Sequence, residues 1–285
     1  METSLSHWSS RDVSYDLAGW AQSEINMKKT LFQGSVSNFT FLLLMALSVF
    51  ALADEPKEDN SKVVSVDKPI KLVRSYKLDE VVHYDVKVKM TIAGAEILIS
   101  TGNKITAKEL KKDGTFMIVE DPDIMKITAG GKESKAPGSK PWKEFRDSRA
   151  ILKDYIVDDD PSAITSPNGL KLVASVSDII LPEKEVKSGE FWETELDNPT
   201  RPGKKFKIKT TFLGSEKIDD VEYMKLDQNV EVAFEIESSK LKYHLIAWVD
   251  TANGQMFKVK GDLKGLPTQS GGLNWLIDMQ RSKPK

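Results

Sequence analysis

The side chains that most often carry out chemistry are scarce in this sequence. It has no cysteine, which excludes cysteine nucleophiles, zinc–thiolate sites and iron–sulfur clusters. Of its three histidines, His83 and His244 lie far apart on the polar faces of expected strands, and no histidine pair has metal-ligand spacing. Motifs for a serine nucleophile or a phosphate-binding loop are absent. We therefore expect no catalytic residue, no metal ion, no cofactor and no enzymatic activity.

Clustered carboxylates are the remaining candidates for a site. Asp158-Asp159-Asp160 could supply oxygens to a calcium ion, but the sixth and twelfth positions of an EF-hand loop counted from Asp158 are Ala163 and Gly169. We therefore interpret the run as a solvated loop. Glu193 and Glu195 lie two residues apart on an expected strand and could form a glycosidase-type pair. Ion pairing with lysines across the sheet is the simpler interpretation.

The elements that would position any site are mainly strands. Three segments alternate apolar and polar residues with a period of two, which places each set on its own face of a sheet. Their inward positions are Tyr84, Val86, Val88, Met90 and Ile92; Phe206, Ile208, Thr210 and Phe212; and Val230, Val232, Phe234 and Ile236. Such alternation is typical of antiparallel sheets. If the last two segments are neighbours, we expect ion pairs of Lys205, Lys207 and Lys209 with Glu231, Glu235 and Glu237.

Tight-turn residues separate these strands. Ala93-Gly94-Ala95, Asp113-Gly114 and Asn253-Gly254 each lie between two segments rich in apolar residues, and Gly accepts the positive φ of hairpin turns. We predict a mainly β fold of antiparallel sheets, arranged as a curved sheet, half-barrel or sandwich, with few short helices. A shift of 107 residues lays Asp113 on Asp220 and Phe116 on Tyr223. Two similar repeats are one interpretation, and chance similarity between two meanders is the other.

The middle and the last part of the sequence lack the period of two. Pro141–Arg146 could open a helix whose buried face carries Trp142 and Phe145. Ser166–Gly169 is typical of a turn, after which we expect a strand over Leu170–Val176. The tail could form one or two amphipathic helical turns around Leu273, Trp275, Leu276 and Met279.

Residues 27–53 have the three parts of a secretory signal. Met27–Lys29 is basic, Phe39–Phe50 is an apolar run, and Ala51-Leu52-Ala53 is a small-x-small cleavage site. We expect cleavage after Ala53 and a soluble periplasmic or extracellular protein; an uncleaved membrane anchor is the alternative. The predicted organisation is 1–26 extension upstream of the true start, 27–53 signal peptide, 54–70 flexible leader, 71–129 first β unit, 130–169 loop and helix connector, 170–270 second β unit and 271–285 tail.

Two segments resemble known exported proteins. In Trp248–Val259 a strand ends at Asp250, Gly254 lies in a short turn and a second strand follows, which resembles the closing hairpin of LolA-like envelope proteins. Leu181–Trp192 is similar to a segment common in uncharacterised exported bacterial proteins. The LolA-like resemblance implies a curved antiparallel sheet whose apolar concave face holds lipid chains in that family. It implies no catalytic residues.

The balance of charge and the aromatic residues limit the classes of partner that the protein could bind. The 41 basic and 43 acidic residues nearly balance, so no nucleic-acid partner is expected. Aromatic residues on strands are core residues by default, or could line an apolar-ligand cavity: Tyr84, Phe191, Trp192, Phe206, Phe212, Phe234, Tyr243, Trp248 and Phe257. We hypothesise an envelope protein that binds an apolar ligand such as lipid between a curved sheet and Trp142–Tyr155. The alternative is a structural module that binds an envelope protein.

Overall fold

The structure is a computed structural model that describes residues 63–92, 95–138, 140–157, 166–234, 240–268 and 271–282. The upstream extension, the export signal, Asp158–Asp160 and most of the predicted leader lie outside these residues, so those predictions stand as made.

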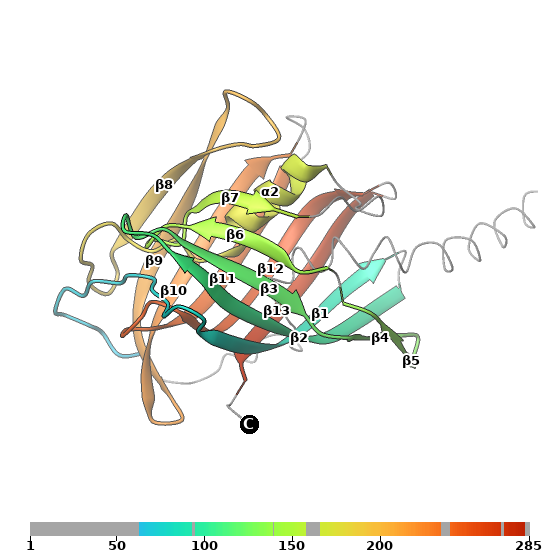
Figure 1. The fold of residues 1–285 in the computed structure, drawn as a ribbon, viewed down its shortest axis with the longest axis horizontal. Helices are drawn as coiled ribbons and strands as arrows, with labels where there is room; N and C mark the ends of the chain where they lie inside the picture. The colour runs from blue at the N-terminus through green and yellow to red at the C-terminus, as the bar shows by residue number, and fades with distance from the viewer. Residues whose placement is uncertain are drawn as a thin grey trace, which may run out of the picture. The chain divides into compact units, whose positions relative to one another are not determined.

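Thirteen strands form one antiparallel sheet, shown in Figure 1. The prediction of a mainly β, antiparallel fold is confirmed, and α2 is the one helix among the described residues. The bounds are β1 Val81–Ile92, β2 Ala95–Leu110, β3 Phe116–Pro122, β4 Met125–Ala129, β5 Lys132–Ala136, β6 Trp142–Arg146, β7 Leu152–Ile156, α2 Pro167–Ser177, β8 Phe191–Asp197, β9 Lys205–Ile218, β10 Val221–Ala233, β11 Lys240–Asp250, β12 Met256–Thr268 and β13 Gly271–Arg281.

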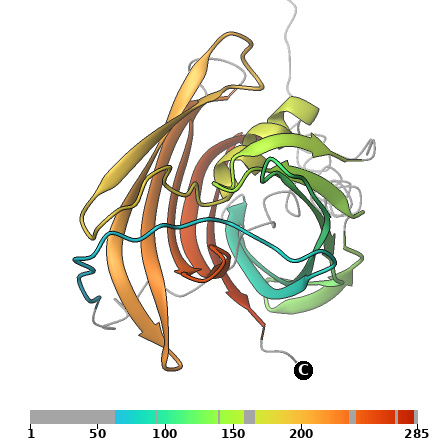
Figure 2. The ribbon, with the colours of Figure 1, turned by 60° about the vertical axis from the view of Figure 1, so that its left-hand side comes forward.

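The sheet is a single curved layer that does not close on itself in its described part. Its order is β7-β6-β3-β2-β1-β13-β12-β11-β10-β9-β8, and β4 branches from β2 to pair with β5. Figure 2 shows how strongly the layer curves, with β1 and β13 side by side at its centre. The arrangement is therefore a curved sheet rather than a sandwich of two sheets.

The predicted alternation decides which face is buried. On β1, Tyr84, Val86, Val88 and Met90 are buried, whereas Asp85 and Lys87, which lie between them, are exposed. The apolar positions of β9 and β10 are buried in the same way. Each large apolar side chain removed from water contributes about 1.5–3 kcal/mol. The buried face of the sheet is thus the core of the protein.

Two of the predicted turns depend on glycine. Gly114 between β2 and β3 has a φ of 83°, and Gly254 between β11 and β12 has a φ of 65°. A Cβ on Gly254 would lie 2.4 Å from the backbone oxygen of Val73. Only glycine therefore lets the segment before β1 pass this close to the turn.

The helix predicted to begin at Pro141 is wrong, because Trp142–Arg146 is strand β6 and pairs with β3 and β7. Its inward side chains are Trp142, Glu144 and Arg146. Two of these three are charged, which hid the period of two from a search for apolar residues. Burial of the charged side chains is possible because they pair with each other, as described below.

The strand predicted over Leu170–Val176 is also wrong, because these residues lie in α2. The signal taken for a turn is a helix start: Ser166 is the N-cap, its hydroxyl oxygen accepts a hydrogen bond from the Gly169 amide at 3.1 Å, and Pro167 is the first helical residue. The helix carries Asn168, Lys171 and Ser175 on one side and buried, mostly apolar residues elsewhere, so it shows no period of two.

The amphipathic turns predicted for the tail are wrong, because Gly271–Arg281 is strand β13. Trp275, Ile277 and Met279 are buried, and Leu276 between them is exposed. The grouping of Trp275 with Leu276 had combined residues from opposite faces of one strand. β13 pairs with β12 on one side and β1 on the other, so it lies at the centre of the sheet.

Candidate functional site

The helix α2 lies on the buried face of the sheet, beside β7 (Figures 1 and 2). Leu170, Leu172, Val173 and Val176 on α2 are buried, and Ile179, Ile180 and Leu181, which follow it, are buried as well. The apolar side of a helix is stable in water only when other elements cover it. The segment from α2 to Leu181 therefore belongs to the core on the buried face of the sheet.

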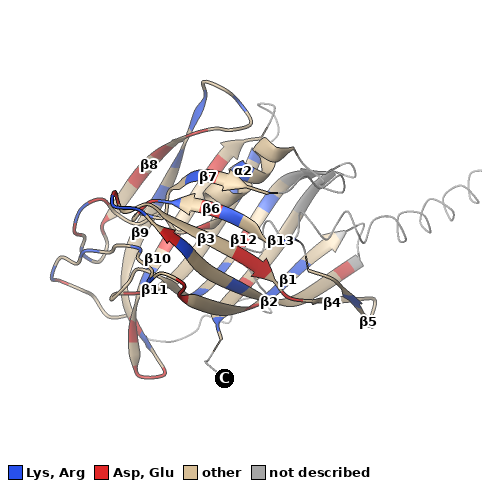
Figure 3. Cartoon of the chain, viewed as in Figure 1, with Lys and Arg blue, Asp and Glu red and all other residues tan. Residues whose placement is uncertain are grey.

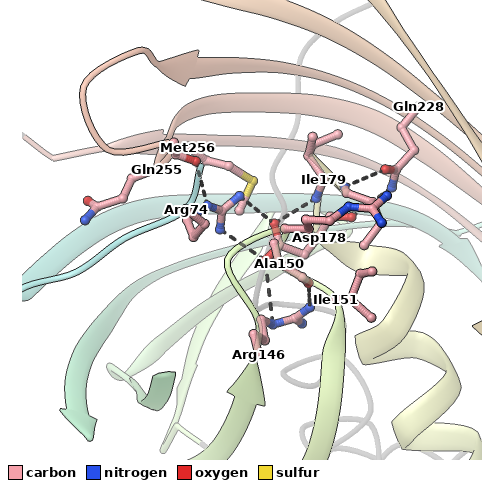
Figure 4. Close-up of polar contacts among 12 residues, drawn as sticks. Arg74, Arg146, Ala150, Ile151, Asp178, Ile179, Gln228, Gln255 and Met256 are labelled. Atoms are coloured by element: carbon pink, nitrogen blue, oxygen red, sulfur yellow. Dashed lines mark hydrogen bonds and ion pairs between the residues drawn. The ribbon is translucent and has the colours of Figure 1, made fainter. Parts of the chain in front are cut away.

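A buried charged residue, Asp178, caps the end of α2 (Figure 4). Its two carboxylate oxygens accept hydrogen bonds from Nη1 and Nη2 of Arg74, both at 3.1 Å. Arg74 also donates from Nε to the backbone oxygen of Gly254 at 2.6 Å. Burial opposes the positive charge, but Asp178, with contributions from Tyr76 and Tyr84, raises the pKa of Arg74 overall. The end of the helix is thus tied to the segment before β1.

A second guanidinium, from Arg146 on β6, approaches the same carboxylate. Its Nε is 3.6 Å from Asp178 Oδ2 and donates to Glu144 Oε2 at 2.7 Å. Its Nη2 donates to the backbone oxygen of Ala174 at 2.9 Å, which satisfies a carbonyl in the last turn of α2. Trp142 Nε1 donates to the other oxygen of Glu144 at 3.2 Å. Arg146 thereby connects β6 with the helix.

The other half of the sheet binds the same segment through Gln228 on β10. Its Nε2 donates to the backbone oxygen of Asp178 at 2.8 Å, and its Oε1 accepts from the amide of Ile180 at 2.8 Å. Thr210 on β9 donates to the same Oε1 at 3.1 Å. The side-chain amide of Gln228 therefore hydrogen-bonds to the backbone of residues 178–180 as a neighbouring strand would. Both halves of the sheet meet at the end of α2.

A third carboxyl group, Glu120 on β3, completes the buried cluster. It is 2% exposed and accepts a hydrogen bond from Asn103 Nδ2 at 2.7 Å. Burial and the nearby Glu144 raise the pKa of Glu120 well above its usual value, and Asn103 and Arg146 oppose this only in part. The buried Oδ1 atom of Asn103 has no hydrogen-bond partner among the described residues.

The charges of this cluster balance when one of its three carboxyl groups carries a proton, and Glu120, whose pKa is raised by burial and by Glu144, is the one that we expect to carry it. Arg74 and Arg146 supply two positive charges, and Glu144 and Asp178 supply two negative charges. All five side chains are buried, so an unbalanced charge would be costly. Chemically, the arrangement can hold a helix and store a proton.

Two open clefts lie on the surface of the described region. One, of about 610 Å³, is bounded by Arg149, Pro182–Val186 and Gly189–Glu193. The other, of about 450 Å³, lies over β10, β11 and β12 and includes Glu231, Lys242 and His244. Both are lined by charged as well as apolar side chains. Neither is an enclosed apolar cavity.

The two histidines of the β region lie on the polar face, as predicted. His83 is exposed, and His244 is partly exposed, with Nε2 3.1 Å from Asp227 and Nδ1 3.5 Å from Asp262. The hydrogen bond with Asp227 leads the contributions that raise the pKa of His244. In the described part of the chain, no group of three or more metal-ligating side chains could hold a metal ion.

Glu193 and Glu195 form ion pairs with lysines across the sheet, as expected, and these lysines are Lys205 and Lys207, which were predicted to pair with Glu231, Glu235 and Glu237 instead. Lys207 lies 2.9 Å from Glu193, and Lys205 lies 3.0 Å from Glu195, because β8 is the neighbour of β9 on this side. Glu231 instead pairs with Lys240 and Lys242 at 2.6 and 2.9 Å, and these lysines lower its pKa to about 2. The other predicted partners, Glu235 and Glu237, lie outside the described residues.

The segment Trp142–Tyr155 does not cover the sheet as predicted, because it forms β6 and β7 within it. The element beside it on the buried face is α2, whose residues were predicted to form a strand. The cluster around Asp178 was missed altogether. Its one available signal was the presence of Glu120, Glu144 and Arg146 at positions where the period of two places inward side chains.

Comparison with known proteins gives no family. No protein-family model and no curated protein matches this chain. A DUF1329 family protein from Desulfovibrio piger is 8% identical over 73% of this chain and 88% of its own, with a TM-score of 0.23. A domain assigned to outer membrane lipoprotein sorting, from Vibrio parahaemolyticus, is 8% identical over 72% and 86%, with a TM-score of 0.22. At such TM-scores the LolA-like resemblance of the hairpin stays a prediction.

Among the residues that the structure describes, none of the helices is both long and apolar enough to cross a membrane.

Proposed function

We propose that this chain is an exported, non-enzymatic protein of the cell envelope that binds an apolar ligand, such as a lipid, on the buried face of its curved sheet. The export signal at residues 27–53 supports the location. The apolar chemistry of the buried face supports the ligand, since binding sites for small molecules are concave and mostly apolar.

The observation that carries the proposal is the uneven attachment of α2. Its C-terminal end receives the polar contacts of Arg74, Arg146 and Gln228. Toward its start, the described residues include the exposed pair of Lys171 with Asp154 at 3.4 Å. The helix can therefore swing outward about its clamped end and uncover the face beneath it. A lipid chain would then take the place of the helix.

The free energies involved are comparable. Exposing four large apolar side chains, Leu170, Leu172, Val173 and Val176, would cost about 6–12 kcal/mol at about 1.5–3 kcal/mol each. Burial of an acyl chain contributes about 0.8 kcal/mol per methylene, so a chain of about 14 methylenes contributes about 11 kcal/mol. One or two acyl chains would therefore offset the opening.

Mass spectrometry tests binding directly. The full chain is purified from its own host and its mass is compared under native and denaturing conditions. We expect co-purifying lipid that is released on denaturation, and a processed form that begins at Asp54. A bare protein mass, with no uptake of palmitate on titration, would contradict the ligand.

Thiol labelling tests the movement of α2, because the chain has no cysteine of its own. Leu172→Cys places a thiol on the buried face of the helix, and Val221→Cys places a control thiol at an exposed strand start. We expect palmitate to accelerate alkylation of Leu172→Cys by N-ethylmaleimide and to leave Val221→Cys unchanged. Equal rates with and without palmitate would refute the opening.

A structural or protein-interaction module is the second candidate. The observation that favours it is the form of the two clefts, which are open and charged, together with the filling of the buried face by α2. A module of this kind needs no unfilled apolar volume. A bare protein mass in the first experiment, together with no effect of palmitate on alkylation in the second, would make it the better account.

A further inference from the structure

The strand β8, Phe191–Asp197, is one end of the sheet and pairs only with β9 among the described strands. Its opposite edge is therefore the place where the sheet could accept another strand. Such addition is a common mode of peptide recognition, in which backbone hydrogen bonds supply affinity and alternate side chains supply specificity.

The register shows which backbone groups face this edge. In an antiparallel pair, alternate residues exchange hydrogen bonds with the partner strand. The bonds from Phe212 N to Glu190 O at 2.9 Å and from Asn198 N to Lys204 O at 2.9 Å fix the phase. By this phase Trp192, Thr194 and Leu196 bond to β9. The N–H and C=O groups of Phe191, Glu193, Glu195 and Asp197 point to the open edge.

No hydrogen bond to these outward backbone groups is found in the described part of the chain. Solvent reaches this edge, since Phe191 is 59% exposed and the side chains of Glu193 and Glu195 are about half exposed. The cleft of about 610 Å³ borders its first residues, between Pro182–Val186 and Phe191–Glu193. The edge is thus both unpaired and open.

The side chains of β8 indicate which residue types a partner strand needs on each of its two faces. Glu193, Glu195 and Asp197 lie on the exposed face of the strand, and Trp192 and Leu196 lie partly buried on the other face. Side chains directly opposite on neighbouring strands lie about 4.5–5.5 Å apart, so opposite charges attract and like charges repel. A partner strand therefore needs basic residues on one face and apolar residues on the other.

β9, the strand that pairs with the other edge of β8, already has this pattern of basic and apolar residues. It presents Lys205, Lys207 and Lys209 to the acidic face and Phe206 and Ile208 to the apolar face. Figure 3 shows basic and acidic residues side by side along these strands. The sequence pattern of β9 is thus a template for the missing partner.

A second copy of this chain does not fit the edge. Two β8 edges paired antiparallel would place carboxylates against carboxylates, which is unfavourable. The other end strand of the sheet, β7, carries Lys153 next to Asp154 and lacks the alternation of basic with apolar residues. We propose that the free edge of β8 binds an extended segment of a different protein, in which Lys or Arg alternates with apolar residues.

A synthetic peptide, Lys-Val-Lys-Ile-Lys-Val-Lys, tests this proposal on the full chain. Backbone amide exchange should slow at Phe191, Glu193, Glu195 and Asp197 when the peptide binds, with Thr194 and Leu196 slow before and after. A peptide N-methylated at alternate residues, which cannot complete the ladder, should not bind. Equal binding of the methylated peptide, or no binding of the parent at about 1 mM, would overturn strand addition.

Two variants keep the test independent of folding. Glu193→Gln with Glu195→Gln should weaken the basic peptide about two- to thirtyfold, since each cross-strand charge pair contributes about 0.2–1 kcal/mol. Glu195→Pro removes an outward N–H, which an edge strand tolerates, and should abolish peptide binding while β8 stays paired with β9. An acidic peptide, Glu-Val-Glu-Ile-Glu-Val-Glu, that binds as tightly as the basic one would refute the predicted chemistry.

The strand-addition test is separate from the test of the apolar ligand. Glu195→Pro leaves α2 and the buried face untouched, so lipid content should not change in this variant. Loss of peptide binding in a variant that retains its lipid would show that the peptide binds at the β8 edge and that the lipid does not. A variant that loses the slow exchange of Thr194 and Leu196 no longer forms β8. In that case the effect of Glu193→Gln with Glu195→Gln on peptide affinity decides whether the peptide binds at this edge.

Discussion

Replacement of Glu120 by glutamine should stabilise the protein, and the gain should grow with pH. Glu120 is 2% exposed, and two guanidiniums already balance the two carboxylates of Glu144 and Asp178. Glutamine is the neutral analogue of the protonated carboxyl group and can still accept the hydrogen bond from Asn103. The substitution removes only the need to hold a proton.

The magnitude follows from proton linkage. In the unfolded chain Glu120 titrates near its ordinary pKa of 4.5, whereas burial and Glu144 raise its pKa in the folded state well above that value. Below pH 4.5 both states bind the proton, so this group does not make stability depend on pH. Above pH 4.5 only the folded state retains it, and the free energy of unfolding falls by about 1.4 kcal/mol per pH unit until the folded pKa is reached.

The assay is urea unfolding of the native protein and of Glu120→Gln at pH 4, 5, 6 and 7, followed by tryptophan fluorescence. The difference in free energy between the two should rise by about 1.4 kcal/mol per pH unit above pH 4.5. Glu193→Gln, an exposed carboxylate paired with Lys207, should differ from the native protein by about 1 kcal/mol or less throughout. A difference for Glu120→Gln that is flat or falls with rising pH would show that the group is ionised in the fold, and the charge balance argued above would be wrong.

Three further substitutions test the elements around this cluster. Asp178→Asn leaves Arg74 buried without its counter-ion and should lower the free energy of unfolding by about 3–5 kcal/mol in urea, whereas a loss below about 1 kcal/mol would show that the pair is not a clamp. Ser166→Ala removes the helix N-cap and should cost about 1 kcal/mol in a thermal melt, and an unchanged melting temperature would contradict the cap. Gly261→Ala would place a Cβ 2.2 Å from the backbone oxygen of His244 and should cost about 1–3 kcal/mol or more by chemical denaturation; a neutral result would mean that β11 and β12 can separate freely.

The strands could be predicted because one physical constraint acts on single residues along the chain. Wherever one face of a strand is buried and the other faces water, apolar and polar residues alternate in the local sequence, as at Tyr84 to Met90 and Phe206 to Phe212. β6 was not predicted as a strand because two of its inward positions are the charged residues Glu144 and Arg146. Their burial depends on partners elsewhere in the chain, which no local pattern reveals.

The helix and the site could not be predicted for the same reason. The polar side of α2 consists of Asn168, Lys171 and Ser175, and Ser166-Pro167 fits a turn as well as a helix start, so tertiary cover decides between helix and strand. Asp178 meets Arg74 across 104 positions of sequence and Gln228 across 50. Such contacts exist only after the sheet has curved. The pairing of Glu193 and Glu195 with lysines was foreseeable from charge, but its partners depend on strand order.

The pairing of β1 with β13 at the centre of the sheet constrains when the protein can fold during synthesis. Val81 at the start of β1 and Gly271 at the start of β13 are 190 residues apart, 271 minus 81. A ribosome that adds about 5–20 residues per second needs about 10–40 s to make this interval. Throughout that time β1 exposes an unpaired edge, and β12 later does the same. Completion of the sheet is therefore a late, non-local step that only chains including β13 can take.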